Sequence, residues 1–287
     1  MKTHTLALGI TLLIWCCKTP LPEHLELLTY LPKSMEENSG METIPGSPLV
    51  WFINDSGNKD HLYGINLQGK IEKDFNIKGA SNEDWEDLAA DEQGNIYIAD
   101  IGNNNFKRDQ LYIYKLPNPA TISGDNIEAE EIEITYPGHD KNQPFNAEAL
   151  LYYKDRLYIF TKNVKKDQGP ATRLFSVPAS PGKHEATLMG DITTCKNQET
   201  CEITAADISP DGKVLLLLGY DSLWIAPNFL EQDSIPPFRR IALQHRTQKE
   251  AVCFFDNQTL FISDERNSTG GGILYRYISD QLKAEVE

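Results

Sequence analysis

The chain has 287 residues, of which 40% are hydrophobic and 24% are charged, and its formal net charge is −15. This hydrophobic content is enough for a sizeable core, and the length fits one large all-β domain or two ordinary domains. The acidic excess argues against a nucleic-acid-binding protein, because phosphate recognition needs clustered Lys and Arg. It permits cation binding, although an acidic surface is also an ordinary property of soluble proteins.

The chain opens with a pattern that is typical of an export signal. An apolar run at residues 6–15 is too short to span a bilayer, and Cys16 and Cys17 follow it. The cysteine pair resembles the lipobox of bacterial lipoproteins, in which a cysteine thiol is acylated. Residues 1–17 are therefore predicted to be a signal peptide with Cys17 as the lipid anchor, and residues 18–23 a tether. A plain cleaved signal is the alternative, and the predicted location is the periplasm or the outer membrane.

The other cysteines point to an oxidising compartment rather than to zinc. Cys195 and Cys201 lie in the polar segment TTCKNQETCE and can close a small disulfide loop after export. Cys253 lies in the apolar stretch AVCFF and is predicted to be a buried free thiol. Zinc is not expected, because the cysteines have no CxxC partner and no histidine cluster.

One phrase recurs five times along the rest of the chain. In each copy a lead residue lies nine or ten positions before the start of an apolar strand; the lead residues are Ser39, Glu86, Glu148, Thr204 and Glu250. A short first strand begins near the lead residue, and a tight turn such as DEQGN or SPDGK follows. The apolar second strands are VWFI, IYIA, LYIF, VLLLL and LFIS. Their continuous apolar character indicates strands that are buried on both faces.

Two further strands complete each unit. The third strands are predicted in HLYGIN, QLYIYKL, TRLFSVP, SLWIAP and GILYRYI. The fourth strands are predicted in KIEKDFNIK, EEIEITYP, ATLMGDI and FRRIALQ, and the last unit lacks one. The N-terminal segment HLELLTYLPK is strand-like and can pair with the last unit.

Four antiparallel strands repeated around a ring predict an all-β protein with a single β-propeller domain at residues 24–287. The lead residues are 47, 62, 56 and 46 positions apart, and insertions such as PNPATISGDNIEAE account for the longer intervals. We expect five blades of four strands, closed by the N-terminal strand, with six blades as the alternative. Closure protects the sheet edges, and the protein is expected to be a monomer.

The first strands of a propeller line its central channel, so the lead residues should form a ring at one level. Glu86, Glu148 and Glu250 would then face a common axis, with Asp100 and Asp264 near the ends of second strands. Converging carboxylates repel one another. A bound Ca²⁺ ion, a retained proton or a nearby Lys or Arg can relieve the repulsion. The five acidic residues are therefore candidate metal ligands, and the alternative is that the lead residues only hydrogen-bond neighbouring blades.

Polar residues also gather where the second strands end. A channel mouth built in this way can bind a peptide, a glycan or a small molecule. The candidate ligand-binding residues are Asn54, Asp55, Trp85, Asn103 and Asn104. For Trp85, a core position and a ligand-stacking position are equally compatible with the sequence.

The leading phrases WEDLA, AEALL, TAADI and EAVCF, together with SGM, resemble those of the SdiA-regulated, YjiK-like proteins of bacteria. The resemblance covers nearly the whole mature chain and implies an exported five-bladed propeller that can hold calcium in its channel. A more distant likeness extends to esterase-like phytase domains and to propellers that hydrolyse sugar lactones. The chain departs from these patterns at residues 147–149 and 204–206, which lack the glycine expected there.

Two functions remain open at this point. The first is a binding or scaffold module that touches the membrane only through its lipid anchor. The second is a metal-dependent hydrolase of phosphoesters or lactones, with the channel glutamates holding the metal and Asp100 or Asp264 acting as the base. No complete catalytic constellation is visible in the sequence, which favours the binding module.

Overall fold

The computed structural model describes the protein at residues 20–108, 110–138, 145–164, 171–194, 202–232, 234–268, 270–278 and 282. The predicted anchor Cys17 and the predicted disulfide partners Cys195 and Cys201 lie outside these residues. Within the described part of the chain, no helix combines the length and the apolar character needed to cross a bilayer.

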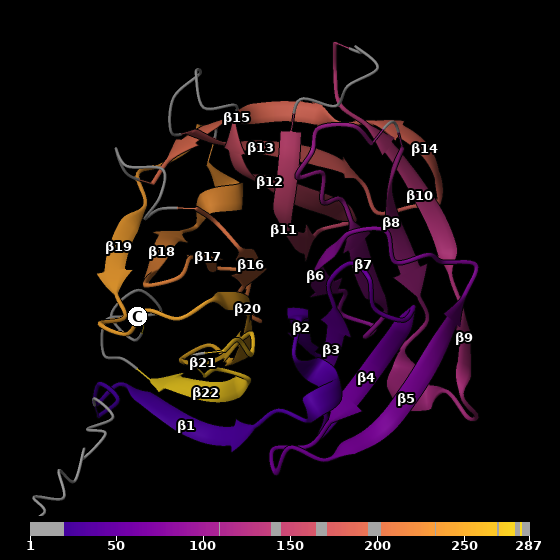
Figure 1. Cartoon of the computed structure of the whole chain (residues 1–287). Coiled ribbons are helices and arrows are strands. Elements are labelled where there is room, and N and C mark those ends of the chain that lie inside the picture. Colours follow the sequence, from indigo (N-terminus) through magenta and orange to yellow (C-terminus); the bar gives the residue numbers. More distant parts are fainter. Residues whose placement is uncertain are drawn as a thin grey trace, which may run out of the picture.

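Five sheets stand around a central axis like the blades of a propeller (Figure 1). Each blade has four antiparallel strands, and the first of them lies nearest the axis. Blade 1 contains β2 (Asn38–Thr43), β3 (Val50–Asn54), β4 (His61–Ile65) and β5 (Ile71–Lys78). Blade 2 contains β6 (Trp85–Ala90), β7 (Ile96–Asp100), β8 (Leu111–Leu116) and β10 (Glu130–Thr135). The five-bladed architecture predicted from the repeated phrase is confirmed.

The other three blades follow the same plan. Blade 3 contains β11 (Phe145–Tyr153), β12 (Arg156–Val164), β13 (Ala171–Pro178) and β15 (Thr187–Thr193). Blade 4 contains β16 (Ala205–Ile208), β17 (Val214–Leu218), β18 (Ser222–Pro227) and β19 (Arg239–Ala242). Blade 5 contains β20 (Lys249–Asp256), β21 (Thr259–Asp264), β22 (Ile273–Ile278) and β1 (Leu25–Tyr30).

Strand β1 closes the ring by pairing antiparallel with β22, as the sequence predicted. The register places Leu25 opposite Tyr277, Tyr277 opposite Leu260, and Leu260 opposite Phe254. The row across blade 5 therefore joins the start of β1 to the end of β20. The outer edge of the last blade is paired by the opposite end of the chain, which removes a strand edge that could recruit another molecule.

Two short strands that the sequence did not predict extend the outer edges of blades 1 and 2. β9 (Asn126–Glu128) pairs in parallel with β5, and β14 (Gly182–Glu185) pairs in parallel with β10. The insertion PNPATISGDNIEAE thus forms the 3₁₀ helix η2 (Pro119–Thr121) and then β9. Two more 3₁₀ turns, η1 (Lys33–Met35) and η4 (Phe229–Glu231), lie in other connections.

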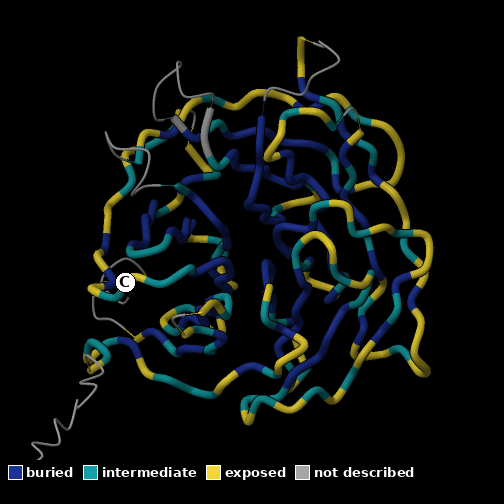
Figure 2. The backbone as a smooth tube through the Cα atoms, in the orientation of Figure 1, coloured by how far each residue is buried: buried dark blue, intermediate teal, exposed yellow. Residues whose placement is uncertain are grey.

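The core lies between the blades rather than within one sandwich. Burial increases from the outer strands towards the axis (Figure 2). Each of five hydrophobic clusters joins residues of two neighbouring blades. Between blades 1 and 2, for example, Trp51 and Phe75 pack in the same cluster as Trp85. This arrangement explains why the second strands are apolar on both faces.

Candidate functional site

Four of the five lead residues occupy β-bulges. The pairing register shifts around Ser39 in β2, Glu86 in β6, Glu148 in β11 and Glu250 in β20. The fifth lead residue, Thr204, directly precedes β16. A bulge places an extra residue in one strand and redirects its side chain. The repeated phrase therefore marks the position of a β-bulge in the first strand of four blades, at one end of the channel.

These residues meet at a small cavity of about 100 Å³, which we call the acidic mouth. The described residues that line it are Ser39, Asp55, Glu86, Asn104, Glu148, Lys162, Tyr220, Gln248, Glu250 and Glu265. The structure thus brings the three lead glutamates together. Lys162 is the one cation among these lining residues, beside five carboxylates.

The two lead hydroxyl groups connect neighbouring blades. Ser39 Oγ donates a hydrogen bond to the Trp85 carbonyl over 2.7 Å, and Thr204 Oγ1 donates one to the Lys249 carbonyl over 2.8 Å. In each case the acceptor is the residue just before the lead glutamate of the next blade. The alternative prediction, that the lead residues hydrogen-bond neighbouring blades, thus applies to Ser39 and Thr204. The lead glutamates instead face the cavity.

Glu148 forms an ion pair, whereas no ion pair is found for Glu86 in the part of the chain that the structure describes. Lys162 Nζ donates a hydrogen bond to Glu148 Oε2 over 2.9 Å, and Asn146 Nδ2 donates one to Oε1 over 2.7 Å. The side chain of Glu86 is only 7% exposed. Among the described residues, none donates a hydrogen bond to its carboxylate. A buried, charged carboxylate is energetically costly when no hydrogen-bond donor contacts it. Glu86 is therefore stabilised by taking up a proton or by binding a cation.

Asp55 and Asp84 lie beside Glu86. One carboxylate oxygen from each of the three residues lies within 4.8 Å of the other two. Asp84 and Glu86 are two positions apart in the chain, and Asp55 directly follows β3. Gly102 leaves room for the group, because a Cβ atom there would lie 2.5 Å from Asp84 Cγ and would overlap Glu86 Oε1.

The electrostatics of the acidic mouth favour protons or cations. Burial raises the pKa of Glu86 well above its usual value, and the Glu148 carboxylate raises it further. Burial raises the pKa of Asp55 to about 6 and the pKa of Glu265 to about 7. Burial likewise raises the pKa of Glu250 well above its usual value, although Lys162 opposes the shift. Each shift shows that negative charge is unfavourable here unless a cation is supplied.

The other two candidate metal ligands do not line the acidic mouth. Asp100 Oδ2 accepts a hydrogen bond from Arg108 Nη2 over 2.9 Å, and its Oδ1 accepts one from the Asp84 backbone N–H over 2.8 Å. Asp264 accepts hydrogen bonds from the Ile273 N–H and the Tyr275 hydroxyl. Both aspartates are buried and hold the second strands of their blades to neighbouring segments.

The five candidate ligand-binding residues separate into two groups. Asp55 and the exposed Asn104 line the acidic mouth. Asn54 is buried and donates to the Ser34 carbonyl over 2.9 Å, and Asn103 Oδ1 accepts the backbone N–H groups of residues 107 and 108. Trp85 is fully buried, and its Nε1 donates to the Ser81 carbonyl over 3.0 Å, so it is a core residue.

Sequence reasoning left several residues of this site unassigned. Asp84 precedes β6 and Glu86 lies at a bulge, so the alternation of side chains along a strand gives no signal that the two carboxylates meet. Lys162 lies late in β12 and Glu265 directly follows β21, where polar residues gather. Tyr220 and Gln248 belong to connections, and the repeat pattern carries no signal for them.

The donor set fits a calcium ion. Ca²⁺ takes six to eight oxygen ligands and tolerates irregular geometry. Asp55, Asp84 and Glu86 supply carboxylate oxygens close enough to share one ion, and Glu86 has no competing partner among the described residues. The remaining coordination positions would be filled by water or by a ligand that enters the acidic mouth.

No model of a known protein family matches the sequence, and no curated protein matches it either. The resemblance to the SdiA-regulated proteins therefore stays a prediction. Solved structures do match in fold, and 631 chains reach significance. A luciferin-regenerating enzyme has a TM-score of 0.49 at 10% sequence identity, with 89% of this chain and 95% of that chain covered.

Two further solved structures match with similar scores. A gluconolactonase from Xanthomonas campestris has a TM-score of 0.49 at 12% identity, with 88% of this chain and 89% of that chain covered. A chain of a nidogen/laminin complex has a TM-score of 0.48 at 11% identity, with 90% and 94% covered. At these identities and TM-scores the matches support no conclusion about the function of this chain.

Proposed function

We propose that this protein is a calcium-dependent binding module whose ligand docks at the acidic mouth. The observation that carries the proposal is the carboxylate of Glu86. It is more than nine-tenths buried, has no hydrogen-bond donor among the described residues, and lies within 4.8 Å of Asp55 and Asp84 oxygens. A calcium ion would neutralise this group and would leave coordination positions open towards the solvent.

The ligand class follows from the chemistry of an exposed calcium ion. Hydroxyl and carboxylate oxygens of a glycan or an acidic peptide can complete its coordination shell. Asn104 at the rim adds an amide that can donate and accept hydrogen bonds. A binding role is favoured over hydrolysis because Asp100 and Asp264, the candidate bases, are held outside the cavity by Arg108 and Tyr275.

We also propose that the protein is exported and anchored through Cys17. Leu21 already packs against the hydrophobic cluster between blades 4 and 5, and β1 begins at Leu25. Leu25, at the start of β1, lies in the same row of paired residues as Phe254, near the end of β20. Glu250 lies near the other end of β20, so β1 begins at the end of the channel that is opposite the acidic mouth. An anchor at Cys17 would therefore present the acidic mouth away from the membrane.

The test is a ligand screen in the presence and absence of calcium. The purified protein is applied to glycan and acidic-peptide arrays in about 2 mM calcium or in a chelator, and it is also assayed with phosphoester and lactone substrates. Calcium-dependent capture without turnover supports the binding module. Calcium-dependent turnover that Glu148→Gln abolishes would replace it with the hydrolase.

A further inference from the structure

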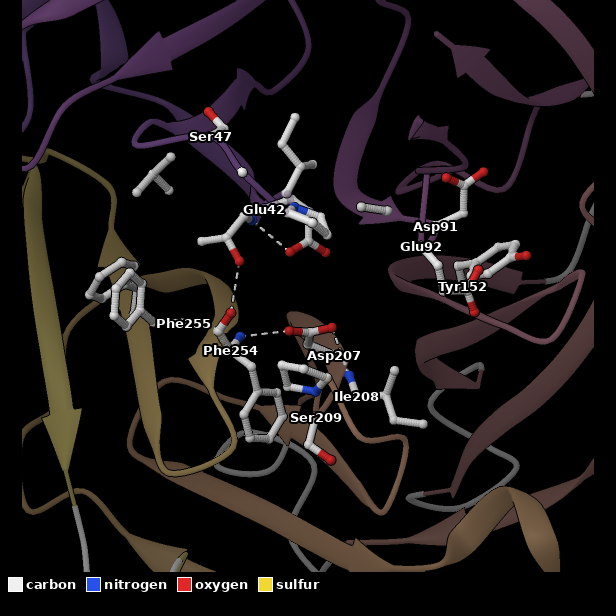
Figure 3. Close-up of a pocket in the computed structure, with 18 of the residues that line it drawn as sticks. Glu42, Ser47, Asp91, Glu92, Tyr152, Asp207, Ile208, Ser209, Phe254 and Phe255 are labelled. Carbon is white, nitrogen blue, oxygen red and sulfur yellow. Dashed lines mark hydrogen bonds between the residues drawn. The ribbon is translucent and has the colours of Figure 1, made fainter. Parts of the chain in front are cut away.

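A second, larger cavity lies at the other end of the channel. It has a volume of about 750 Å³ and is bounded by the hairpins that join the first and second strands of all five blades; we call it the hairpin-end cavity (Figure 3). It shares no lining residue with the acidic mouth. Asp87 lies between the two, since its carboxylate accepts the backbone N–H groups of Leu150 and Ala206 across the axis.

The walls of the hairpin-end cavity carry apolar and polar groups in similar measure. Aromatic residues from blades 3 and 5 line it, notably Tyr152, Phe254 and Phe255. Phe255 is 54% exposed at the rim, where its ring lies 5.0 Å from that of Phe261. Organic ligands bind in apolar cavities of about 300–1,000 Å³ that carry a few fixed polar groups. The volume of this cavity falls in that range, and its lining combines aromatic rings with carboxylates.

Two buried carboxylates supply the polar groups. Glu42 is 6% exposed and Asp207 is 8% exposed, and Figure 3 shows both pointing towards the middle of the cavity. Asp207 accepts the Ile208 N–H over 2.7 Å and the Phe254 N–H over 2.6 Å. Glu42 Oε1 accepts the Thr43 N–H over 2.6 Å. Its second oxygen has no hydrogen-bond partner among the described residues.

No cation lies beside these carboxylates among the described residues that line the cavity. Lys154 is the one cationic residue among the described lining residues. It is at the rim, where its Nζ lies 3.6 Å from the Glu231 carboxylate and 4.7 Å from the centre of the Tyr153 ring. Burial raises the pKa of Glu42 well above its usual value, and the Asp207 charge raises it further. The pair therefore either retains a proton or requires a counter-charge.

We propose that the hairpin-end cavity binds a small amphipathic amine, with the ammonium group between Glu42 and Asp207 and the apolar body against the aromatic walls. The ammonium supplies the missing positive charge and can donate to the free Glu42 oxygen. The exposed ring of Phe255 offers apolar contact to the body of the ligand. This site is independent of the proposed calcium site, because no residue is common to both.

The experiment uses three probes that share an indole-ethyl body and carry a positive, a neutral or a negative head group. Calorimetric titrations of the full protein, in a chelator so that calcium plays no part, compare tryptamine with its neutral alcohol and its anionic propionate analogue. We expect tryptamine to bind at least about tenfold more tightly than either analogue. Equal affinity for all three, or no binding of tryptamine at about 1 mM, would overturn the proposal.

A matched pair of variants locates the site. Glu42→Gln keeps an acceptor for the Thr43 N–H but removes the charge, and we expect it to weaken tryptamine binding at least about tenfold. Glu72→Gln makes the same change on β5, where Glu72 pairs with Lys70, and should leave the affinity unchanged. Unchanged tryptamine binding by a folded Glu42→Gln protein would contradict the assignment. The probe comparison on the unmodified protein remains decisive if the variant does not fold.

Discussion

Lys162 Nζ lies 2.9 Å from Glu148 Oε2, and this ion pair occupies a cavity whose lining includes four further carboxylates. Burial lowers the pKa of Lys162, but the charges of Glu148 and Glu250 outweigh burial and leave the pKa raised. Lys162 thus supplies positive charge to Glu148 and Glu250 on one side of the acidic mouth. On the other side, the Arg108 charge acts on Asp84, but no described lining residue forms an ion pair with Asp55 or Glu86.

Replacement of Lys162 tests this balance. Lys162→Met leaves Glu148 buried without its partner, and we expect the free energy of unfolding in a chelator to fall by about 3 kcal/mol. Calcium should restore more stability to this variant than to the unmodified protein. Urea unfolding with and without calcium measures both effects. The control, Lys70→Met, removes an exposed ion pair with Glu72 and should change the free energy of unfolding by less than about 0.5 kcal/mol. A similar loss in both variants would refute the conclusion that Lys162 neutralises a buried carboxylate.

Asp100 should prove structural rather than metal-binding. Asp100→Asn keeps an acceptor for the Asp84 N–H but leaves the half-buried Arg108 guanidinium with the Glu83 carboxylate, 3.4 Å from its Nε, as its remaining ion-pair partner. We expect a loss of roughly 2–4 kcal/mol in the free energy of unfolding. Calcium affinity, measured by calorimetry, should change less than in Glu86→Gln, because Asp100 contacts Asp84 through its backbone N–H rather than through its carboxylate. Loss of calcium binding without loss of stability would reverse the assignment.

The pH dependence of stability follows from the raised pKa values. Asp207 and Glu265 have a pKa of about 7 in the folded protein, Asp55 has a pKa of about 6, and the pKa values of Glu42 and Glu86 are raised as well. Between about pH 4 and pH 7 the folded state therefore binds more protons than the unfolded state, and stability falls as the pH rises.

In a chelator, we expect the midpoint of urea unfolding to be higher at about pH 5 than at about pH 7.5. The shifts of Asp211 and His245, whose pKa values are lowered, oppose this trend but involve only two groups. Calcium should reduce the difference, because the ion replaces protons on the carboxylates. An unfolding midpoint that rises steadily over the same pH range in the chelator would contradict the account.

Gly102 provides a test that alters no charge. In Gly102→Ala the new methyl group would displace the ends of the Asp84 and Glu86 side chains. We expect calcium affinity to fall on the order of tenfold. Thermal unfolding in a chelator should shift by no more than a few degrees, because only side-chain ends are displaced. If calcium affinity stays at the level of the unmodified protein, the ion does not depend on this trio of carboxylates.

The repeated phrase was sufficient to predict the blades. Continuous apolar second strands such as VLLLL and turn residues such as those in SPDGK report burial and hairpins directly, and these are local properties. Closure by β1 was predictable because blade 5 lacked an outer strand. β9 and β14 were not, because short parallel strands at a sheet edge depend on which loop passes nearby, and this is a tertiary property.

The candidate site was only partly predictable. Glu86, Glu148 and Glu250 follow from the repeat, because equivalent positions of a ring lie at one level. Asp100 and Asp264 occupy an equally regular position, yet Arg108 and Tyr275 draw them away from the axis. Those partners lie in loops or on third strands, and a single sequence does not show that they reach the aspartates. The hairpin-end cavity was missed because Glu42 and Asp207 were not among the lead positions or the second-strand ends from which the site was sought.

The central claim is that Asp55, Asp84 and Glu86 bind a calcium ion, and a calcium titration of Glu86→Gln tests it most directly. For the unmodified protein, calorimetry should give a dissociation constant on the order of 10⁻⁵–10⁻³ M, and thermal unfolding should shift upward with calcium concentration. Glu86→Gln should weaken binding at least about tenfold, while Glu72→Gln should bind as the unmodified protein does. Absence of any heat or thermal shift at about 10 mM calcium, or full calcium affinity in the Glu86→Gln protein, would contradict the claim.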